Sequence, residues 1–182
     1  MNRVSVIGTS GSGKSTLARR LSKVLSVPCV ELDAIHWQQG GWTPLPQDQF
    51  TGVVAEAVRQ DRWVVEGGYS AVRPLVWERA DTVVWLDYPL LVTFGRLLRR
   101  TARRVVLKEQ LWGGNRESLS LMLSRESILL WCLQTHVPNR RKYAEQLGRP
   151  ENQHLRVLRF QSPRQADRWL AGLMRSTVTE EE

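Results

Sequence analysis

The stretch Gly8-Thr9-Ser10-Gly11-Ser12-Gly13-Lys14-Ser15 decides the fold, because it matches the pattern GxxxxGK(S/T) at every fixed position. A short apolar run, residues 4–7, precedes it, and apolar residues at helical spacing follow it between positions 17 and 25. The local order is therefore strand, loop, helix. That is the context in which this pattern forms a phosphate-binding loop.

Each residue type in the loop has a physical task. Glycines permit the left-handed turns that aim successive backbone N–H groups inward, and the start of the following helix adds partial positive charge. Lys14 is predicted to neutralise the β- and γ-phosphates of ATP, and Ser15 to offer its hydroxyl to Mg²⁺. The predicted nucleotide-binding residues are Gly8, Thr9, Ser10, Gly11, Ser12, Gly13, Lys14, Ser15 and Thr16.

Outside the loop, strand patterns alternate with helix patterns. Further strands are predicted at 29–32, 63–65, 82–86 and 155–160, with a loop at 36–46. Helices are predicted at 50–58, 89–108 and 163–174, with a long helix that begins at Asn115, breaks at Pro138 and ends near Gly148. This alternation predicts an α/β fold whose parallel sheet is covered on both faces and binds ligands at the carboxyl ends of its strands.

Composition sets the protein class. The 182 residues are 42% hydrophobic and 24% charged, which suits one globular domain. No apolar run approaches the roughly 20 residues of a membrane-spanning helix, and the N-terminus lacks a signal-peptide pattern, so we expect a cytoplasmic protein without a membrane partner. Cys29 and Cys132 are expected to be reduced, buried thiols, and no zinc site is expected.

The positive charge lies in one segment. Residues 96–149 hold 12 basic and 4 acidic residues, which equals the whole net charge of +8, since the rest of the chain has 14 of each sign. Such a segment can serve a bound triphosphate or a nucleic acid backbone.

Three carboxylates follow predicted strands. Asp33, Glu66 and Asp87 should lie along the sheet edge that carries the phosphate loop. An acid there can hold metal-bound water or accept a proton from an acceptor hydroxyl. For each of the three, a strand-end cap or an ion pair remains an alternative, most of all for Asp87.

Five stretches together resemble the adenylate kinase-related proteins that are labelled DNA topology modulation proteins. They are residues 8–15, 31–37 (ELDAIHW), 63–69 (WVVEGGY), 80–87 (ADTVVWLD) and 111–118 (LWGGNRES). The resemblance implies the P-loop, nucleoside-monophosphate-kinase-like fold, a parallel five-stranded sheet of order 2-3-1-4-5 with helices on both faces and an Arg-rich lid. It implies one domain, residues 1–175, with an acceptor-side segment at 34–60 and the lid and helical insertion at 96–149, before an acidic tail at 176–182 that we expect to be disordered.

The resemblance also implies roles for single residues. Arg96 and Arg100 match arginines that contact the adenine face and the transferring phosphate, and Arg116 and Arg140 are further lid candidates. Glu66 stands where adenylate kinases carry an Asp before glycine, which makes it a candidate for the metal. With Lys14 and Asp33, these arginines form the predicted catalytic set.

The acceptor is expected beside the second and third strands. The predicted substrate-binding residues are Asp33, His36, Trp37, Gly67, Gly68 and Tyr69. Trp37 can stack on a base or a sugar, although Trp37, Trp42 and Trp77 can also simply cover a small core. The remaining histidines, His136 and His154, are expected to be solvated.

The favoured function is an ATP- and Mg²⁺-dependent kinase acting on a small-molecule acceptor such as a nucleotide or nucleoside. A nucleic-acid-binding or regulatory P-loop ATPase is the less favoured alternative, supported by the basic segment but by no DNA-reading module. A kinase of the shikimate or gluconate type would differ only in its acceptor pocket, and the sequence does not exclude it. The oligomeric state is not determined by the sequence.

Overall fold

The computed structural model describes residues 1–38, 40–115 and 127–179, and their side chains up to residue 176. These residues form a parallel sheet with the strand order β2-β3-β1-β4-β5. This confirms the predicted order. The strands are β1 (Arg3–Gly8), β2 (Cys29–Glu31), β3 (Trp63–Glu66), β4 (Thr82–Leu86) and β5 (Arg156–Phe160).

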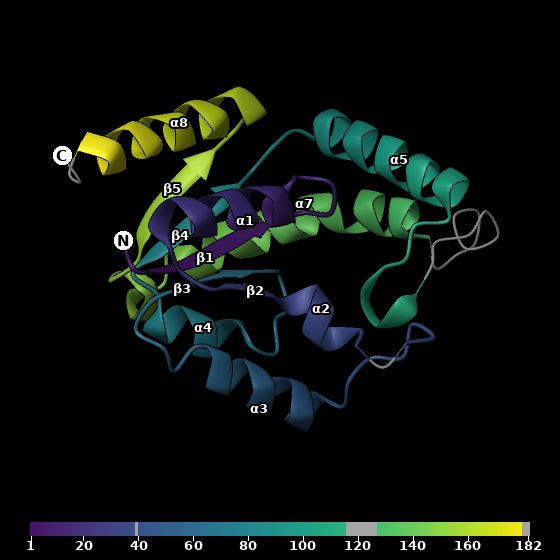
Figure 1. The fold of residues 1–182 in the computed structure, drawn as a ribbon, viewed down its shortest axis with the longest axis horizontal. Coiled ribbons are helices and arrows are strands. Elements are labelled where there is room, and N and C mark those ends of the chain that lie inside the picture. Colours follow the sequence, from purple (N-terminus) through teal and green to yellow (C-terminus); the bar gives the residue numbers. More distant parts are fainter. Residues whose placement is uncertain (39, 116–126, 180–182) are drawn as a thin grey trace.

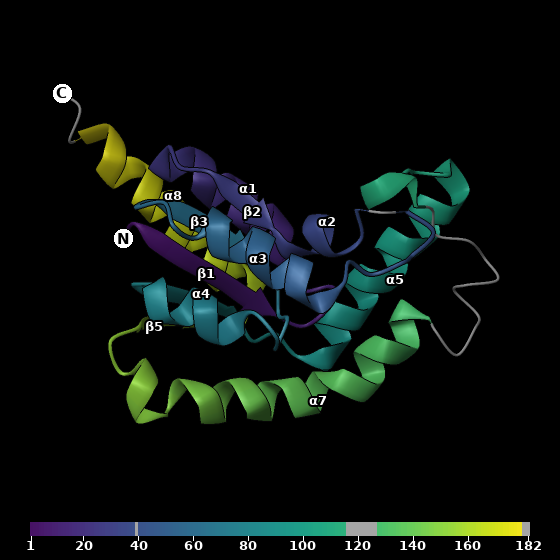
Figure 2. The same ribbon diagram turned by 90° about the horizontal axis from the view of Figure 1, so that it is seen from below.

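Helices cover both faces of the sheet, as Figures 1 and 2 show. They are α1 (Lys14–Leu25), α2 (Leu32–His36), α3 (Gln47–Ala57), α4 (Arg73–Arg79), α5 (Leu90–Leu107), α7 (Ile128–Leu147) and α8 (Pro163–Thr179), with short 3₁₀ turns η1 (Trp112–Gly114) and η2 (Pro150–Asn152). The helices α1 and α8 lie on one face, and α3, α4 and the second half of α7 lie toward the other (Figures 1 and 2).

Alternating side chains of the central strands divide the core in two. On one face Val6, Val84 and Leu86 pack against α1 and α8, and on the other Val65, Val83 and Trp85 pack against α3, α4 and α7. Strands β1, β3 and β4 are buried on both faces, which is why their sequences are mainly apolar and not strictly alternating. The rigid sheet fixes the level at which each strand ends, and therefore the position of the loops that follow.

Two predicted segments near the acceptor side differ from the structure. Strand β2 stops at Glu31 and is only half buried, because it forms an edge of the sheet, whereas a buried strand to residue 32 was expected. The chain then turns directly into α2, where residue 36 was expected to start a loop. Helix α4, between Arg73 and Arg79, was not predicted, because its short apolar pattern is interrupted by Pro74.

The C-terminal half also differs in detail. Helix α7 begins after Ser127, whose hydroxyl accepts a hydrogen bond from the Leu129 amide, and it continues through Pro138 instead of breaking there. Pro138 is exposed, so its ring faces solvent while the helix bends (Figure 2). The predicted helical start at Asn115 leads into residues 116–126, which lie outside the described residues. Helix α8 reaches Thr179 instead of 174, so the beginning of the predicted tail is helical.

Among the described helices, none combines the length and the apolar character needed to cross a membrane.

Candidate nucleotide and acceptor site

The phosphate loop joins β1 to α1, where the sequence pattern places it. Gly13 has φ 91° at the start of α1, and Gly11 has φ 80°, values that residues with a Cβ rarely adopt. A Cβ on Gly11 would also collide with the Thr93 carbonyl of α5. The loop is thus shaped by glycine conformations and pressed against α5, so its backbone amides surround a fixed hollow.

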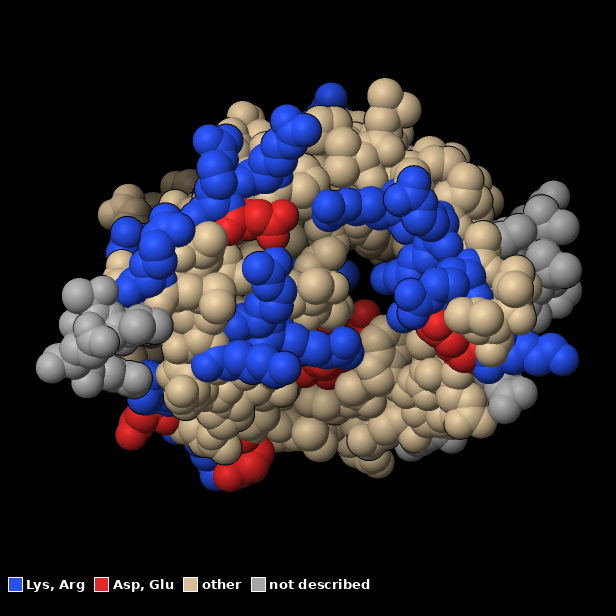
Figure 3. Space-filling model, turned by 45° about the horizontal axis from the view of Figure 1, so that its top comes forward, with Lys and Arg blue, Asp and Glu red and all other residues tan. Residues whose placement is uncertain are grey.

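A cleft of about 1290 Å³ opens at the carboxyl ends of the strands. It is bounded by the loop, α1, α2, α5 and α7, and Figure 3 shows Lys and Arg gathered around a hollow in this surface. Ligand pockets for a single small molecule commonly measure about 300–1000 Å³. The cleft therefore has room for a nucleotide and a second small molecule.

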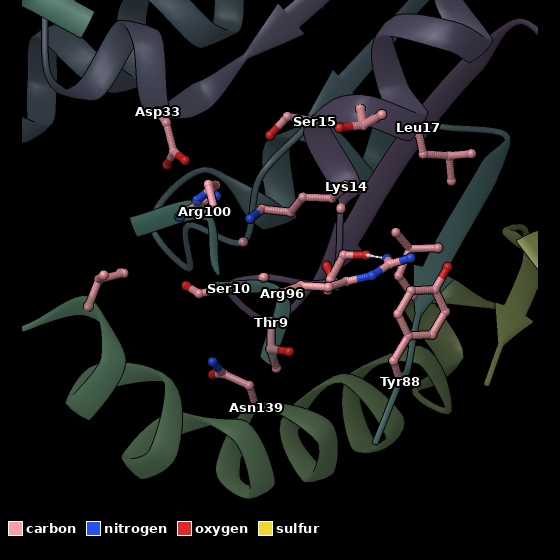
Figure 4. A pocket seen from close by; sticks show the side chains of 18 of the residues that line it. Thr9, Ser10, Lys14, Ser15, Leu17, Asp33, Tyr88, Arg96, Arg100 and Asn139 are labelled. Atoms are coloured by element: carbon pink, nitrogen blue, oxygen red, sulfur yellow. Dashed lines mark hydrogen bonds between the residues drawn. The ribbon is translucent and has the colours of Figure 1, made fainter. Parts of the chain in front are cut away.

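Four sequence-predicted groups meet in this cleft. Lys14, Asp33, Arg96 and Arg100 all line it, and Figure 4 shows the Lys14 ammonium and the Asp33 carboxylate directed into the same hollow from opposite sides. The whole of Gly8 to Thr16 lines it as well. A cation and a carboxylate directed into the same hollow can provide charge for a phosphoryl group and a base for its acceptor.

Ser15 and Glu66 meet beneath the loop. The Ser15 hydroxyl donates to Glu66 Oε1 at 3.0 Å, while Oε2 of the same carboxylate is buried and has no hydrogen-bond partner among the residues that the structure describes. Glu66 has no exposed surface, and this burial raises the pKa of its carboxyl, with the Lys14 charge opposing the rise. A bound cation would coordinate Oε2 of Glu66 and favour the ionised form of this carboxylate.

No cluster of three or more His, Cys, Asp or Glu side chains able to hold a metal occurs within residues 1–38, 40–115 and 127–179. Ser15 and Glu66 nevertheless fit Mg²⁺, because this ion usually takes one or two protein oxygens and completes its shell with phosphate oxygens and water.

Arg96 borders the other end of the loop. Its guanidinium donates to the Ser12 carbonyl at 3.3 Å and lies 5.8 Å from the centre of the Tyr88 ring. Figure 4 shows Arg96 and Tyr88 side by side below Leu17. Arg20 pairs with Asp167 of α8 at 2.9 Å, and both residues line the cleft.

The acceptor end is aromatic. The His36 ring contacts Trp37, Phe50 and Tyr69, with centroid distances of 4.6, 5.1 and 4.6 Å. Burial lowers the pKa of His36, against the opposing charge of Asp33, which favours the neutral imidazole. The Tyr69 hydroxyl donates to Asp33 Oδ1 at 2.6 Å, which fixes the orientation of this carboxylate at the edge of the cleft.

Arg73 stabilises the turn after β3. It is almost fully buried, its guanidinium lies 4.8 Å from the Tyr143 ring centre and 5.7 Å from that of Trp77, and it donates to the Gly68 carbonyl and to Gln146, each at 2.6 Å. Burial lowers its pKa. Arg73 thus joins the glycine turn at the acceptor end to α7.

Among the described residues, three predicted site residues do not line the cleft: Arg140, Gly67 and Glu66, although Glu66 contacts Ser15 beneath the loop. Arg140 of α7 pairs with Asp87, and Arg159 of β5 binds the same carboxylate, with one bond of 3.0 Å from each arginine. Asp87 therefore forms an ion pair, which was the alternative to a site role that the sequence analysis gave for this residue. Gly67 lies behind the cleft against Leu32, and Arg116 lies outside the described residues.

Helix α7 supplies residues that the sequence did not single out. Asn139 projects from it toward Thr9 and Ser10 (Figure 4), and the buried thiol of Cys132 donates to the Ser10 carbonyl at 3.7 Å. His136 is buried rather than solvated, and its Nε2 lies 3.0 Å from the Tyr88 carbonyl. Only the helical period of this segment signalled that one face would pack against the loop; no motif marks these residues.

The sheet order, the loop at its carboxyl edge and the cleft beyond it define the P-loop kinase fold. No protein-family model matches the chain. Shikimate kinases from Mycobacterium ulcerans (strain Agy99) and Mycobacterium marinum (strain ATCC BAA-535 / M) are each 34% identical over 95 residues, an alignment covering 45% of this chain and 52% of each relative. The chain thus matches about half the length of these curated relatives.

Solved structures share the fold over nearly the whole chain. A shikimate kinase from Acinetobacter baumannii in complex with shikimate has a TM-score of 0.57 at 15% identity, covering 99% of this chain and 94% of its own. A gluconokinase from Sinorhizobium meliloti 1021 has a TM-score of 0.50 at 19% identity, covering 100% of this chain and 98% of its own.

Proposed function

We propose that the protein is an ATP-dependent kinase that transfers the γ-phosphate to a hydroxyl of a small molecule. The observation that carries this proposal is the placement of Asp33 opposite Lys14 in a cleft with room for two ligands. A hydrolase or a switch needs the nucleotide subsite but not the aromatic subsite beside Asp33. The partial similarity to shikimate kinases supports the same reaction class.

The proposed chemistry assigns a task to each group. Lys14 and the N-terminus of α1 offset the charge of the β- and γ-phosphates, and Arg100 lies on the same cleft wall to share it. Ser15 and Glu66 would hold Mg²⁺, which supplies further neutralisation of phosphate charge when bound. The acceptor oxygen bonds to the γ-phosphorus as the bond to the β-phosphate oxygen breaks, and the hydroxyl proton passes to Asp33.

The adenine is proposed to lie between Arg96 and the start of α8. Arg96 is held by the Ser12 carbonyl, and Pro163 and Ala166 line the opposite wall. A guanidinium plane and apolar side chains fit the two faces of a base.

The acceptor class is proposed from the neighbours and from the rings. Both named relatives carry hydroxylated acids in their names, and His36, Trp37 and Tyr69 offer ring faces beside Asp33. We include nucleosides and nucleotides, because the resemblance to the DNA topology modulation group, an adenylate kinase-related family, points to them.

A nucleic-acid-dependent ATPase is the second candidate, favoured by one observation. Arginines of α5 lie on the surface beside the cleft, and Arg103 is engaged there only by Glu109, at 2.8 Å, among the described residues. A phosphate backbone could replace that exposed pair.

The test combines two measurements. ADP release is screened over shikimate, gluconate, nucleosides and nucleoside monophosphates, and DNA binding is titrated with salt. One acceptor that raises ADP release far above background, with weak DNA binding erased by salt, supports the kinase. DNA-stimulated hydrolysis that is lost in Arg99→Ala and Arg103→Ala, with no acceptor response, overturns it.

A further inference from the structure

The motif Trp112-Gly113-Gly114-Asn115 has no task in the chemistry above, yet its asparagine is one of the most completely bonded side chains near the cleft. Asn115 is only 5% exposed. Its Oδ1 accepts from the Trp42 amide at 2.7 Å, and its Nδ2 donates to the Trp112 carbonyl at 2.7 Å and the Trp37 carbonyl at 3.4 Å. One side chain therefore joins two segments more than 70 positions apart in the sequence.

The backbone beside Asn115 makes the same contact. Gly113 has φ 63°, and a Cβ there would lie 2.5 Å from both the Gly40 nitrogen and the Trp37 carbonyl oxygen. Gly114 has φ 77°, but a Cβ on it would meet no atom of the described residues within 4 Å. Gly113 is therefore needed for the close approach of two segments of the chain, while Gly114 is needed only for its own backbone conformation.

Both segments that Asn115 joins contribute residues to the lining of the cleft. We call residues 111–115 the lid base, since they follow α5, and residues 37, 38 and 40–43 the acceptor loop. Trp112 of the lid base and Trp37 and Trp42 of the acceptor loop all line the cleft. The rings of Trp37 and Trp42 meet edge to face with centroids 5.7 Å apart.

We propose that Asn115 is a positioning residue that makes the lid base and the acceptor loop move as one body and thereby sets the tryptophan wall of the acceptor subsite. This inference rests on the proposed function only in calling that end of the cleft the acceptor subsite. Movement of α5 on nucleotide binding is then transmitted through Asn115 to Trp37 and Trp42, although neither tryptophan is part of the phosphate loop. Order in the acceptor loop becomes dependent on nucleotide.

The direct test follows the Trp42 amide by hydrogen exchange in NMR, because that amide donates to Asn115. The probe is a non-hydrolysable ATP analogue with Mg²⁺. In the unaltered protein, the analogue should slow exchange in both segments together. In Asn115→Ala, exchange of the Trp42 amide should rise about tenfold or more, and the analogue should slow exchange in the lid base alone.

Matched variants separate this role from general stability. Asn115→Asp keeps an oxygen for the Trp42 amide and should restore part of its protection, although it loses the two donated bonds. Gly113→Ala should uncouple the segments as Asn115→Ala does, whereas Gly114→Ala imposes a similar backbone penalty without touching the acceptor loop and should leave the coupling intact.

The proposal is overturned if the analogue still slows both segments together in Asn115→Ala and Gly113→Ala, or if Gly114→Ala uncouples them equally. With an acceptor in hand, Asn115→Ala should raise its KM about tenfold while the KM for ATP stays within about twofold. Coupled exchange in a protein that phosphorylates no acceptor would reject the kinase function and leave the role of Asn115 standing.

Discussion

The two ends of the cleft are built in opposite ways. The phosphate-binding part of the nucleotide end comes from one continuous stretch, Gly8 to Thr16, and presents mainly backbone groups shaped by glycines. The acceptor end comes from the chain after β2, the turn after β3, the lid base and α7, and presents side chains that hold one another in place. A backbone site depends little on its surroundings, whereas an assembled site depends on every segment that supports it.

This difference separates chemistry from selectivity. The contiguous loop can bind the phosphates of a nucleotide in any protein that contains it, because its donors are peptide groups. The acceptor end can change its ligand by substitution in any of four segments while the loop stays as it is. Perturbations at the nucleotide end should therefore abolish turnover, and those at the acceptor end should redistribute it between substrates or reduce it by degrees.

Among the substitutions that test this difference between the two ends, Lys14→Ala should lower turnover the most. Loss of the ammonium should lower kcat about a thousandfold, because it removes charge that acts most strongly in the transition state. Steady-state kinetics with the acceptor from the screen provides the measurement, and an unchanged melting temperature serves as control. Turnover close to that of the unaltered protein would show that the loop does not carry the chemistry.

Asp33→Asn should rank second. The substitution keeps the shape and the contact with the Tyr69 hydroxyl but removes the base, so kcat should fall about a hundredfold with little change in ATP affinity. Tyr69→Phe is the matched control, since it removes the hydroxyl partner and leaves the carboxylate. A normal kcat across the acceptor panel would reduce Asp33 to a structural role after β2, where it accepts the hydrogen bond from Tyr69.

Glu66→Gln should have an intermediate effect that magnesium can correct. The neutral amide weakens the proposed cation site, so the Mg²⁺ concentration for half-maximal activity should rise about tenfold. A magnesium titration at fixed ATP measures this, and circular dichroism shows whether the buried side chain still packs. If the magnesium requirement is unchanged, the idle Oε2 of Glu66 serves another purpose.

Arg140→Ala should have the smallest kinetic effect, less than about threefold in kcat/KM, because Arg140 binds Asp87 instead of the cleft. Its effect should appear in stability, as a loss of about 1 kcal/mol, since Arg159 still holds the carboxylate. Urea unfolding at neutral pH measures this loss. A hundredfold kinetic defect would return Arg140 to the catalytic set.

The same ion pair gives a pH dependence. Burial raises the pKa of Asp87, but the bonds from Arg140 and Arg159 outweigh it and hold the pKa below its usual value. Stability from this group is therefore complete above the unfolded pKa of about 3.9 and is lost as the pH falls through the lower folded value. Unfolding curves between neutral and acidic pH should show a smaller acid loss in Arg140→Ala.

The sequence predicted the phosphate loop because the loop depends on local patterns: a mainly apolar strand, a glycine-rich turn and an amphipathic helix. The strand order was expected only from the family resemblance, since local patterns do not determine which strands pair. The sequence also placed Asp33 and Glu66 near the loop, since the carboxyl ends of the strands meet at one edge of the sheet, whereas Arg96 was expected there only from the family resemblance. It did not place Arg140, because a helical period does not tell which neighbouring acid will claim an arginine. The partners of Asn115 and Arg73 were likewise out of reach, since they depend on contacts between distant segments.

Because Cys132 contacts the phosphate loop, the reactivity of its thiol reports how often α7 separates from that loop. The thiol is fully buried against the Ser10 carbonyl, and burial raises its pKa, so it is both shielded and poorly ionised while α7 stays seated. A thiol reagent can modify it only when that helix separates from the loop. The rate of labelling at Cys132 thus measures how often α7 separates from the phosphate loop. Mass spectrometry distinguishes this label from one on Cys29.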